Sequence, residues 1–512
     1  MNSVIAPVHD LVRTRSGEVR GSVADGVISF KGISYAAPPF GANHLRPPQP
    51  VESWSGVRDA FEFGPKSPQV RYPANIDRYM PELTGPGEDC LRLNIWTPEP
   101  GATGLPVMVW IPGGMYEFHA TGASPWYDGT RFAQDGVVLV TINYRVGAEG
   151  FLYLNDGTAN VGLQDQIAAL EWVHENIGAF GGDPDNVTIF GESAGALSVG
   201  TLLSMPRAKG LFRRAILQSG AAHHVTSAAS ALKIAQCLAQ NLGVEPTREA
   251  IAAAPVERLL AAQMALRDDL MAHADPQRWG ADVVTSMLPW APVVDGEIVP
   301  ARPIDRIAAG AAADIDLIVG TNVDENRLFL VVSGEMEHIT DPMVAGVAAL
   351  YGLPVQAALA FYRARSYDYG NASANATAGD LLAAIQTDWY WRIPAIRLAD
   401  AHAKNETKAA TFMYEFAWRS PQLNGLLGAC HGSEIPFVFD TLGHGTDMQW
   451  GKQPPQNLAD AMHSAWVRFA ATGDCGWPKY DLTRRATMRF DTVSTAVDDP
   501  RAAELKLWEG VR

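Results

Sequence analysis

The sequence predicts an α/β fold in which a large, mainly parallel sheet is flanked by helices. From about residue 105, apolar runs such as 107–111 and 137–142 alternate with helical patterns. The clearest helical pattern is 164–177, where apolar residues recur about every 3.6 positions. Continuous apolar runs between helices are typical of parallel strands that are covered on both faces.

Further buried strands are expected at 187–190, 215–218, 316–319 and 411–416. Residues 10–35 differ, because apolar and polar positions alternate around two tight-turn signals, Ser16-Gly17 and Asp25-Gly26. That pattern is typical of short antiparallel strands. We therefore expect a small N-terminal antiparallel sheet beside the main one.

The chain of 512 residues is too long for one ordinary core. It forms either several domains or one large sheet with long insertions. Two alanine-rich stretches, about 221–290 and 327–405, have a helical composition and are predicted to be insertions that cover one end of the sheet. Since no repeat, charge block or flexible linker divides the chain, we expect residues 1–512 to form one elaborated domain.

Charge and cysteine content exclude several classes of function. Lys and Arg total 40 against 56 Asp and Glu, a net charge of −16, which disfavours nucleic acid or an anionic membrane as a partner. The N-terminus lacks a basic start followed by an apolar run, and no stretch of about 18 apolar residues occurs. The four cysteines are scattered without CxxC spacing, so we expect a cytoplasmic protein without a zinc or iron–sulfur site.

A candidate nucleophile lies in the segment Gly191-Glu192-Ser193-Ala194-Gly195, which matches the pattern G-x-S-x-G. A predicted strand at 186–190 leads into it, and a helix of small residues at 196–204 follows. A strand-turn-helix elbow leaves room only for small side chains beside the nucleophile, and it places the serine hydroxyl at a helix N-terminus. Ser193 is therefore the predicted nucleophile.

A serine hydroxyl needs a base to remove its proton and a carboxylate to orient that base. In this type of elbow fold the acid follows the serine in the chain, and the histidine follows the acid. The strand at 316–320 ends at a segment that contains Asp324 and Glu325, beyond the carboxyl end of the strand. The pattern does not choose between these two carboxylates.

Few of the twelve histidines follow these acids and lie in a loop. His431 lies after the strand at 411–416 and before an apolar run at 435–439. His402 and His463 fall in helical patterns, and His444 falls in a glycine-rich loop. By its position alone, His431 is either the base or an ordinary loop histidine.

Several segments resemble the type-B carboxylesterase family, which includes bacterial para-nitrobenzyl esterases and the cholinesterases. The most specific are 160–166, 176–184 and 187–195, and shorter ones occur at 88–94, 320–325, 431–437 and 466–470. The resemblance spans roughly residues 10–485. It implies an α/β-hydrolase fold and a serine hydrolase that cleaves a small-molecule carboxylic ester through an acyl-enzyme, without a cofactor. It also implies Glu325, not Asp324, as the acid and His431 as the base.

The same resemblance implies an oxyanion hole formed by the backbone amides of Gly114, Met115 and Ala194, where negative charge develops on the carbonyl oxygen. Here the sequence departs from the family, because Pro112-Gly113-Gly114-Met115 replaces the usual His-Gly-Gly-Gly or His-Gly-Gly-Ala. Met115 adopts either an allowed backbone conformation or a strained positive φ. Its side chain either narrows the acyl site or packs into the core.

Two alternative functions stay open beside ester hydrolysis. The same triad would cleave an amide or a carbamate, and a non-catalytic binding protein is a third possibility, although such relatives typically lose the serine. Cys430 is expected to be a packed thiol and not a second nucleophile. Four aromatic residues are candidates either for the wall of a gorge or for the core: Trp126, Phe329, Trp389 and Trp391. The natural substrate and the oligomeric state are not predicted.

Overall fold

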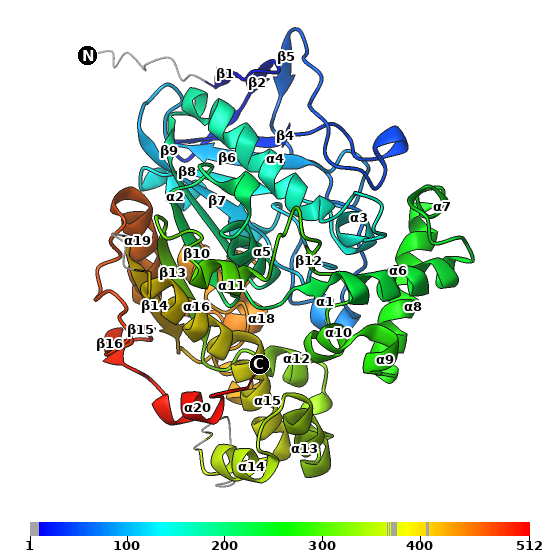
Figure 1. The fold of residues 1–512 in the computed structure, drawn as a ribbon. Coiled ribbons are helices and arrows are strands. Elements are labelled where there is room, and N and C mark those ends of the chain that lie inside the picture. Colours follow the sequence, from blue (N-terminus) through cyan, green and yellow to red (C-terminus); the bar gives the residue numbers. More distant parts are fainter. Residues whose placement is uncertain (1–9, 366, 368, 370–375, 406–408, 512) are drawn as a thin grey trace.

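An eleven-stranded sheet forms the centre of the structure, a computed structural model that describes residues 10–365, 367, 369, 376–405 and 409–511 (Figure 1). In spatial order its strands are β16 (Thr495–Asp498), β15 (Ala486–Phe490), β14 (Thr411–Phe416), β13 (Asp316–Asn322), β10 (Arg214–Gln218), β9 (Gly182–Glu192), β7 (Leu105–Ile111), β8 (Val138–Ile142), β6 (Arg92–Thr97), β4 (Val27–Ser34) and β3 (Ser22–Ala24). Neighbouring strands from β15 to β8 pair in parallel, and the remaining pairs are antiparallel. The prediction of a large, mostly parallel sheet is confirmed.

The two faces of the sheet enter separate hydrophobic clusters, because side chains alternate along each strand. In β7, Val107, Val109 and Ile111 join one cluster, whereas Met108 and Trp110 join the other. The first face is covered by α4 (Val161–Asn176), α5 (Ala194–Leu202), α11 (Pro303–Ala308) and α16 (Ile393–Ala403). The second is covered by α2 (Thr130–Gln134), α17 (Ile435–Phe439) and α19 (Gln456–Thr472). Burial on both faces explains why the parallel strands are continuous apolar runs.

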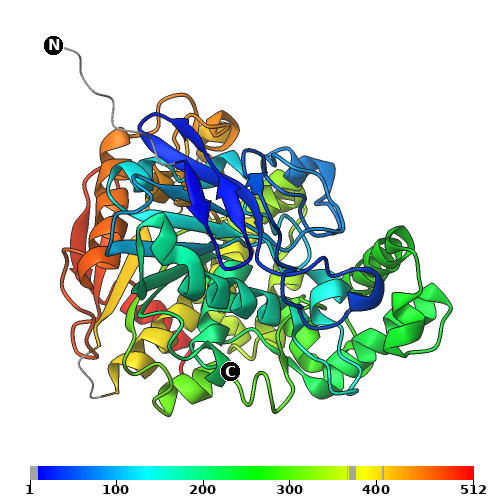
Figure 2. The same cartoon turned by 90° about the horizontal axis from the view of Figure 1, so that it is seen from above.

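Helices make up most of the described residues in both alanine-rich stretches, as the composition predicted; residues 366, 368 and 370–375 of the second stretch lie outside the described residues. The first contains α6 (Ala228–Leu242), α7 (Arg248–Ala252), α8 (Val256–Ala272), α9 (Pro276–Trp279) and α10 (Ala281–Ser286), which project from one side of the sheet in Figure 1 and Figure 2. The second contains α12 (Arg327–Val332), α13 (Asp341–Leu350), α14 (Val355–Arg363), α15 (Ala378–Thr387) and a π-helical turn (Asp388–Arg392). A short parallel pair, β11 (Thr226–Ser227) and β12 (Val293–Val294), flanks the first group. The remaining helices are α1 (Ala74–Asp77), α3 (Gly147–Phe151), α18 (Asp447–Trp450) and α20 (Ala502–Leu507).

The small N-terminal sheet differs in part from its prediction. Strands β1 (Leu11–Arg13) and β2 (Glu18–Arg20) pair in antiparallel fashion, as expected. A third strand, β5 (Val57–Asp59), pairs with β2 in parallel, so the sheet is mixed and not purely antiparallel. All three residues of β5 are exposed, and they therefore carry no apolar alternation that would reveal a strand. Strands β3 and β4 also pair in antiparallel fashion, but they extend the edge of the main sheet.

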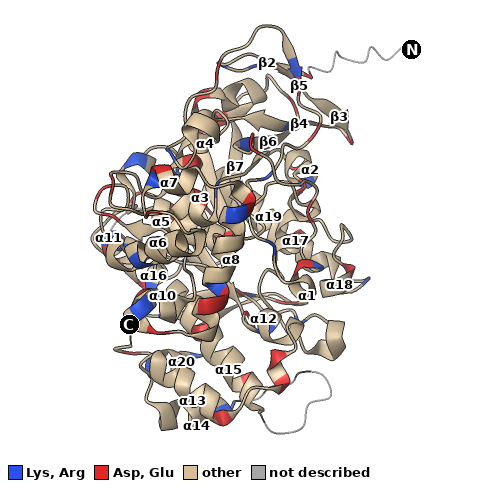
Figure 3. Ribbon diagram, turned by 90° about the vertical axis from the view of Figure 1, so that its right-hand side faces the viewer, with Lys and Arg blue, Asp and Glu red and all other residues tan. Residues whose placement is uncertain are grey.

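Charged residues of both signs are interspersed along the ribbon in Figure 3, although acidic residues exceed basic ones by 56 to 40 over the whole sequence. Across the part of the chain that the structure describes, no helix is both long enough and apolar enough to cross a lipid bilayer.

Candidate active site

Ser193 lies at the sharp turn between β9 and α5, as the motif predicted. Its φ of 57° and ψ of −125° place it in a rarely populated region for a residue with a side chain. A Cβ on Gly195 would lie 2.0 Å from the carbonyl oxygen of Ile111, and one on Gly191 would lie 2.6 Å from the same oxygen. Glycine is therefore the only residue that fits on either side of this elbow.

His431 and Glu325 meet beside the elbow. His431 Nδ1 donates a hydrogen bond of 2.7 Å to Glu325 Oε2. The buried Glu325 is itself fixed, because its Oε1 accepts from the Asn322 amide at 2.8 Å and its carbonyl accepts from the His431 amide at 3.1 Å. A carboxylate only accepts hydrogen bonds, so Nδ1 carries the hydrogen and His431 Nε2 is left to act as the base.

Asp324, the other candidate acid, points away from this pair. Its carboxylate accepts from the Tyr369 hydroxyl and from the Ala429 amide, the latter at 3.0 Å. Arg419 Nε lies 3.8 Å from the same carboxylate. The two adjacent carboxylates thus serve different parts of the structure, and only Glu325 is the partner of His431.

The competing histidines take up other positions. His402 is buried in α16, where its ring nitrogens contact Thr411 Oγ1 at 2.8 Å and the Ala312 carbonyl at 3.1 Å. His463 is buried in α19 and bonds to the Val438 carbonyl at 2.8 Å. His444 is exposed in a loop. His402 and His463 are packed histidines, as their helical patterns indicated.

The loop that follows β7 folds back over the elbow. A Cβ on Gly113 would lie 2.7 Å from the Glu192 carbonyl oxygen and 3.0 Å from Ser193 Cβ. Gly114 has a φ of 104°, and a Cβ there would lie 1.6 Å from the Phe118 carbonyl oxygen. Among the described residues, the amides of Gly114, Met115 and Ala194 find no hydrogen-bond acceptor. These amides are available for an oxygen of a bound substrate.

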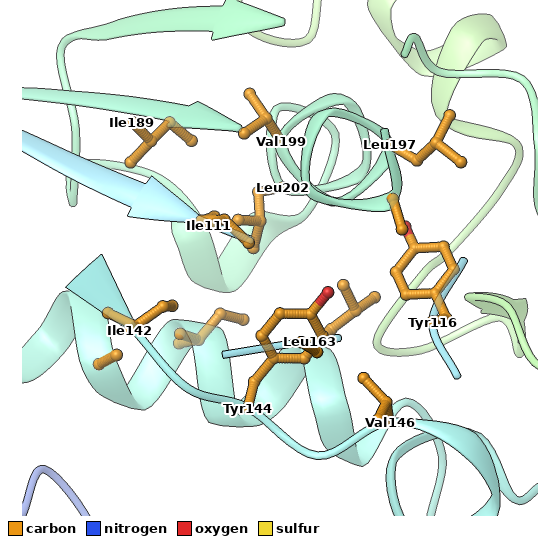
Figure 4. Close-up of a cluster of buried hydrophobic side chains, with 14 of the residues drawn as sticks. Ile111, Tyr116, Ile142, Tyr144, Val146, Leu163, Ile189, Leu197, Val199 and Leu202 are labelled. Carbon is orange, nitrogen blue, oxygen red and sulfur yellow. The ribbon is translucent and has the colours of Figure 1, made fainter. Parts of the chain in front are cut away.

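Met115 follows with a φ of 56°, so it adopts the left-handed conformation that costs a side-chain-bearing residue about 1–2 kcal/mol. Neighbouring contacts hold this strained loop. Figure 4 shows the buried Tyr116 ring in a hydrophobic cluster beside Leu197 of α5. From α8, Arg267 forms an ion pair with Glu117 at 3.0 Å, and its Nη2 lies 3.9 Å from Met115 Sδ.

The Met115 side chain therefore packs toward α8, against the core. It is not among the described residues that line the cavity at Ser193. This position favours the packing alternative over the narrowing of the acyl site.

Replacing Met115 by glycine is expected to leave steric selectivity nearly unchanged, because the removed side chain does not face the cavity. The ratio of kcat/KM for ethyl pivalate to that for ethyl acetate should change by less than about twofold, and so should the ratio for tert-butyl acetate. A rise of about tenfold in either ratio would place the Met115 side chain in the acyl site instead.

A cavity of about 40 Å³ joins these groups. Its floor includes Gly113, Gly114, Ser193 and His431. Its remaining walls are formed by residues from loops, short helices and the end of β9: Tyr72, Met80, His119, Trp126, Tyr127, Glu192, Phe329, Gly432, Ile435 and Gln449. Of these residues, only Trp126 and Phe329 were candidates for such a wall from the sequence alone, and the others carry no sequence pattern that assigns them to the cavity.

The four aromatic residues considered for the wall of a gorge occupy three different places in the structure. Trp126 and Phe329 line the cavity at Ser193. The Trp391 ring lies 4.3 Å from the His431 ring, at an interplanar angle of 30°. Trp389 instead lines a larger cavity of about 440 Å³, together with Asp282 and Arg302.

The electrostatic surroundings of His431 are strongly acidic. Burial disfavours its imidazolium, but the carboxylates of Glu192, Glu325 and Glu434 outweigh that effect and raise the pKa of His431 to about 9. Glu192 Oε1 lies 3.1 Å from His431 Nε2, although the two atoms do not form a well-directed hydrogen bond. Burial raises the pKa of Glu192 to about 8, against the opposing effect of His431. Glu192 is part of the G-x-S-x-G motif, but the motif does not indicate that this side chain contacts His431.

Cys430 is buried next to His431, and burial raises the pKa of its thiol to about 12. It is therefore a packed thiol and not a thiolate nucleophile, in line with its prediction. Within the described ranges, no cluster of three His, Cys, Asp or Glu side chains could hold a metal ion.

Comparisons with known proteins show the family to which the chain belongs. The model of the carboxylesterase family matches residues 9–508. The para-nitrobenzyl esterase of Bacillus subtilis (strain 168) is 37% identical over 508 residues, which cover 96% of this chain and 97% of that protein. The phenmedipham hydrolase of Pseudarthrobacter oxydans is 34% identical, covering 97% and 96% respectively. The crystal structure of the Geobacillus stearothermophilus carboxylesterase EST55 at pH 6.2 superposes with a TM-score of 0.83 at 37% identity, covering 98% of this chain and all of that one.

Proposed function

Because the chain belongs to the carboxylesterase family and is a serine hydrolase of carboxylic esters, we propose that Ser193 is its nucleophile, His431 its general base and Glu325 the carboxylate that orients His431. The observation that carries this assignment is the 2.7 Å hydrogen bond to the buried Glu325 from His431, which lines the same cavity as Ser193. Of the two histidines found among the described residues that line this cavity, His119 and His431, only His431 is hydrogen-bonded to Glu325.

The reaction follows from these positions. Ser193 Oγ attacks the ester carbonyl carbon while His431 Nε2 takes its proton, and the amides of Gly114, Met115 and Ala194 donate to the oxyanion of the tetrahedral intermediate. The intermediate collapses when His431 returns the proton to the leaving alcohol, which leaves an acyl group on Ser193. Water, activated by His431, then releases the acid and restores the serine.

Hydrolysis of a panel of small esters by the purified protein tests the substrate class. The acyl and alcohol chains are varied separately, and matching amides and carbamates are included. We expect turnover of short esters, because the cavity of about 40 Å³ leaves little room for a long chain beside Ser193. A protein that cleaves the amides or carbamates faster than the esters would favour the alternative reaction.

We also propose that the protein is cytoplasmic, that it binds no nucleic acid and that residues 1–512 form one domain. The four free cysteines and the acidic net charge of −16 support the first two statements. The eleven-stranded sheet supports the third, because it includes strands from both ends of the described chain.

The pH dependence of kcat/KM should report the carboxylates around His431. The enzyme needs a neutral imidazole, so kcat/KM should fall as the pH drops below the raised pKa of His431, about 9. Glu192 stabilises the imidazolium and raises this pKa, so Glu192→Gln should lower it. We expect the acidic limb of the profile to move toward lower pH by about one pH unit.

The measurement is kcat/KM for ethyl acetate, followed in a pH-stat between about pH 5.5 and 10 in both proteins. Each profile is normalised to its own plateau, so that a change in the absolute rate does not obscure the position of the limb. A limb that stays in place or moves toward higher pH would show that Glu192 does not set the pKa of the base.

A further inference from the structure

A second histidine, His119, lines the cavity at Ser193. Its side chain is 92% buried, since its exposed fraction is 8%. His119 Nδ1 lies 3.0 Å from Glu82 Oε1, and the same carboxylate accepts a hydrogen bond from Lys66 Nζ. His119 Nε2, in contrast, has no hydrogen-bond partner anywhere in the described parts of the chain.

The Glu82 carboxylate determines whether His119 Nε2 is a hydrogen-bond donor or an acceptor. Although burial opposes ionisation, the contacts with His119 and Lys66 outweigh it and lower the pKa of Glu82 to about 2, so the carboxylate is charged at working pH. Lys66 supplies one positive charge for this carboxylate. A carboxylate can only accept, so Nδ1 carries the hydrogen, and a neutral His119 ring presents Nε2 as an acceptor.

The backbone around His119 holds the ring in place. His119 has a φ of 46°, a left-handed conformation that few side-chain-bearing residues adopt. The next amide, that of Ala120, donates to Gln69 Oε1 at 2.9 Å, and the Thr121 amide donates to the His119 carbonyl at 2.9 Å. An acceptor that is held in this way needs little reorganisation when a partner arrives.

The walls around His119 are largely apolar or aromatic, with Met80, Trp126 and Phe329 among them. The Gln449 side chain also lines the cavity, but its amide already donates to the Tyr79 carbonyl at 3.0 Å. A buried acceptor without a partner is costly, and a ligand that supplies a donor removes this cost.

We propose that His119 Nε2 accepts a hydrogen bond from an N–H or O–H group of the substrate, so that the enzyme prefers esters that carry such a donor. This inference rests on the proposed function, which makes the cavity at Ser193 the place of hydrolysis. His119 selects the substrate through one hydrogen bond and takes no part in the proton transfers, which belong to His431.

The test uses pairs of esters in which a hydroxyl group replaces a methyl group of similar size. The pairs are methyl 3-hydroxybutanoate with methyl 3-methylbutanoate, 2-hydroxyethyl acetate with propyl acetate, and 3-hydroxyphenyl acetate with 3-methylphenyl acetate. They place the donor on the acyl side, on a short alcohol and on an aryl alcohol. The readout is the ratio of kcat/KM within each pair, measured at the same pH for the native protein and for every variant.

In at least one pair, His119→Phe should lower the ratio of the hydroxyl ester to the methyl ester by about tenfold, the value of one buried hydrogen bond. His119→Leu, a smaller side chain that also lacks an acceptor, should produce the same loss, which protects the test against misfolding of the phenylalanine variant. His444→Phe, at an exposed histidine outside the cavity, is the control and should leave every ratio unchanged.

Ratios that stay the same in all three pairs for both His119 variants would overturn the proposal. A failure of the proposed function looks different, because Ser193→Ala would then keep its turnover of the methyl esters. The thermal midpoint of each variant verifies that the ratios come from folded protein.

Discussion

Ester hydrolysis is expected to be lost almost completely when Ser193 is replaced by alanine. We expect kcat to fall by about 10³-fold or more, because the serine, the base and the acid act as a unit and the remaining oxyanion hole accelerates the reaction only weakly. Alanine removes only the hydroxyl group from a side chain that is 5% exposed, so the fold should persist. The measurements are kcat for a short ester at saturating concentration and the thermal midpoint of the variant.

Ser204→Ala is a matched control for this experiment. Ser204 is also buried, lies just past the other end of α5 and donates to the Thr201 carbonyl at 2.8 Å. We expect it to cost some stability and to leave kcat near that of the native protein. If Ser193→Ala keeps a tenth of the native activity in a preparation free of other esterases, Ser193 is not the nucleophile.

The second large effect is expected for Glu325→Gln. Glu325 receives the Nδ1 hydrogen of His431 and thereby directs Nε2 toward the cavity. A glutamine side chain is neutral, so it removes the negative charge that stabilises the His431 imidazolium. Its amide group can also donate to Nδ1, which would favour the wrong tautomer of His431. We expect kcat to fall by about 10²–10⁴-fold, the range for loss of the orienting carboxylate in comparable triads.

Asp324→Asn provides the control, since it changes the adjacent residue in the same way. Asp324 accepts from Tyr369 and Ala429 and has no hydrogen bond to His431. We expect this variant to lose stability and to keep a kcat near the native value once it is folded. The reverse result, a dead Asp324→Asn and an active Glu325→Gln, would exchange the roles of the two carboxylates.

These two carboxylates show where sequence reasoning ended. The order of residues placed both of them beyond the end of a strand, and only the resemblance to a family chose Glu325. Physically, the choice depends on the turn after β13, which directs Glu325 toward His431 and Asp324 toward Tyr369. Adjacent residues in a turn point in different directions, and their spacing in the sequence does not reveal which one faces the site.

The strands also differ in how well the sequence predicts them, depending on whether their burial is visible in their own residues or depends on distant partners. Strand β14 coincides with the predicted run at 411–416, because all six of its residues are buried and four of them are apolar or aromatic. No strand was predicted at β6, although its residues are mostly buried. It contains Asn94, whose side chain bonds to the Thr141 hydroxyl and the Gly32 amide, both at 2.9 Å. A polar residue with such distant partners looks like a loop residue in the sequence.

The wall of the cavity was predicted least well, because its residues are positioned by partners that are distant in the sequence. The elbow at Ser193 is encoded by neighbouring residues, so its spacing is visible in the sequence. His119 enters the cavity because a loop is held by Gln69 and Glu82, which lie well before it in the chain. Such tertiary anchors leave no periodic pattern, and the substrate-binding surface therefore had to come from the structure.

Covalent labelling of the nucleophile tests the central assignment most directly. The protein is treated with a fluorophosphonate that reacts with activated serines, and the labelled peptide is identified by mass spectrometry. We expect one label per chain, on Ser193, with loss of esterase activity in proportion to labelling and no label in Ser193→Ala. A label on a different residue that abolishes activity in the same proportion would show that Ser193 is not the nucleophile.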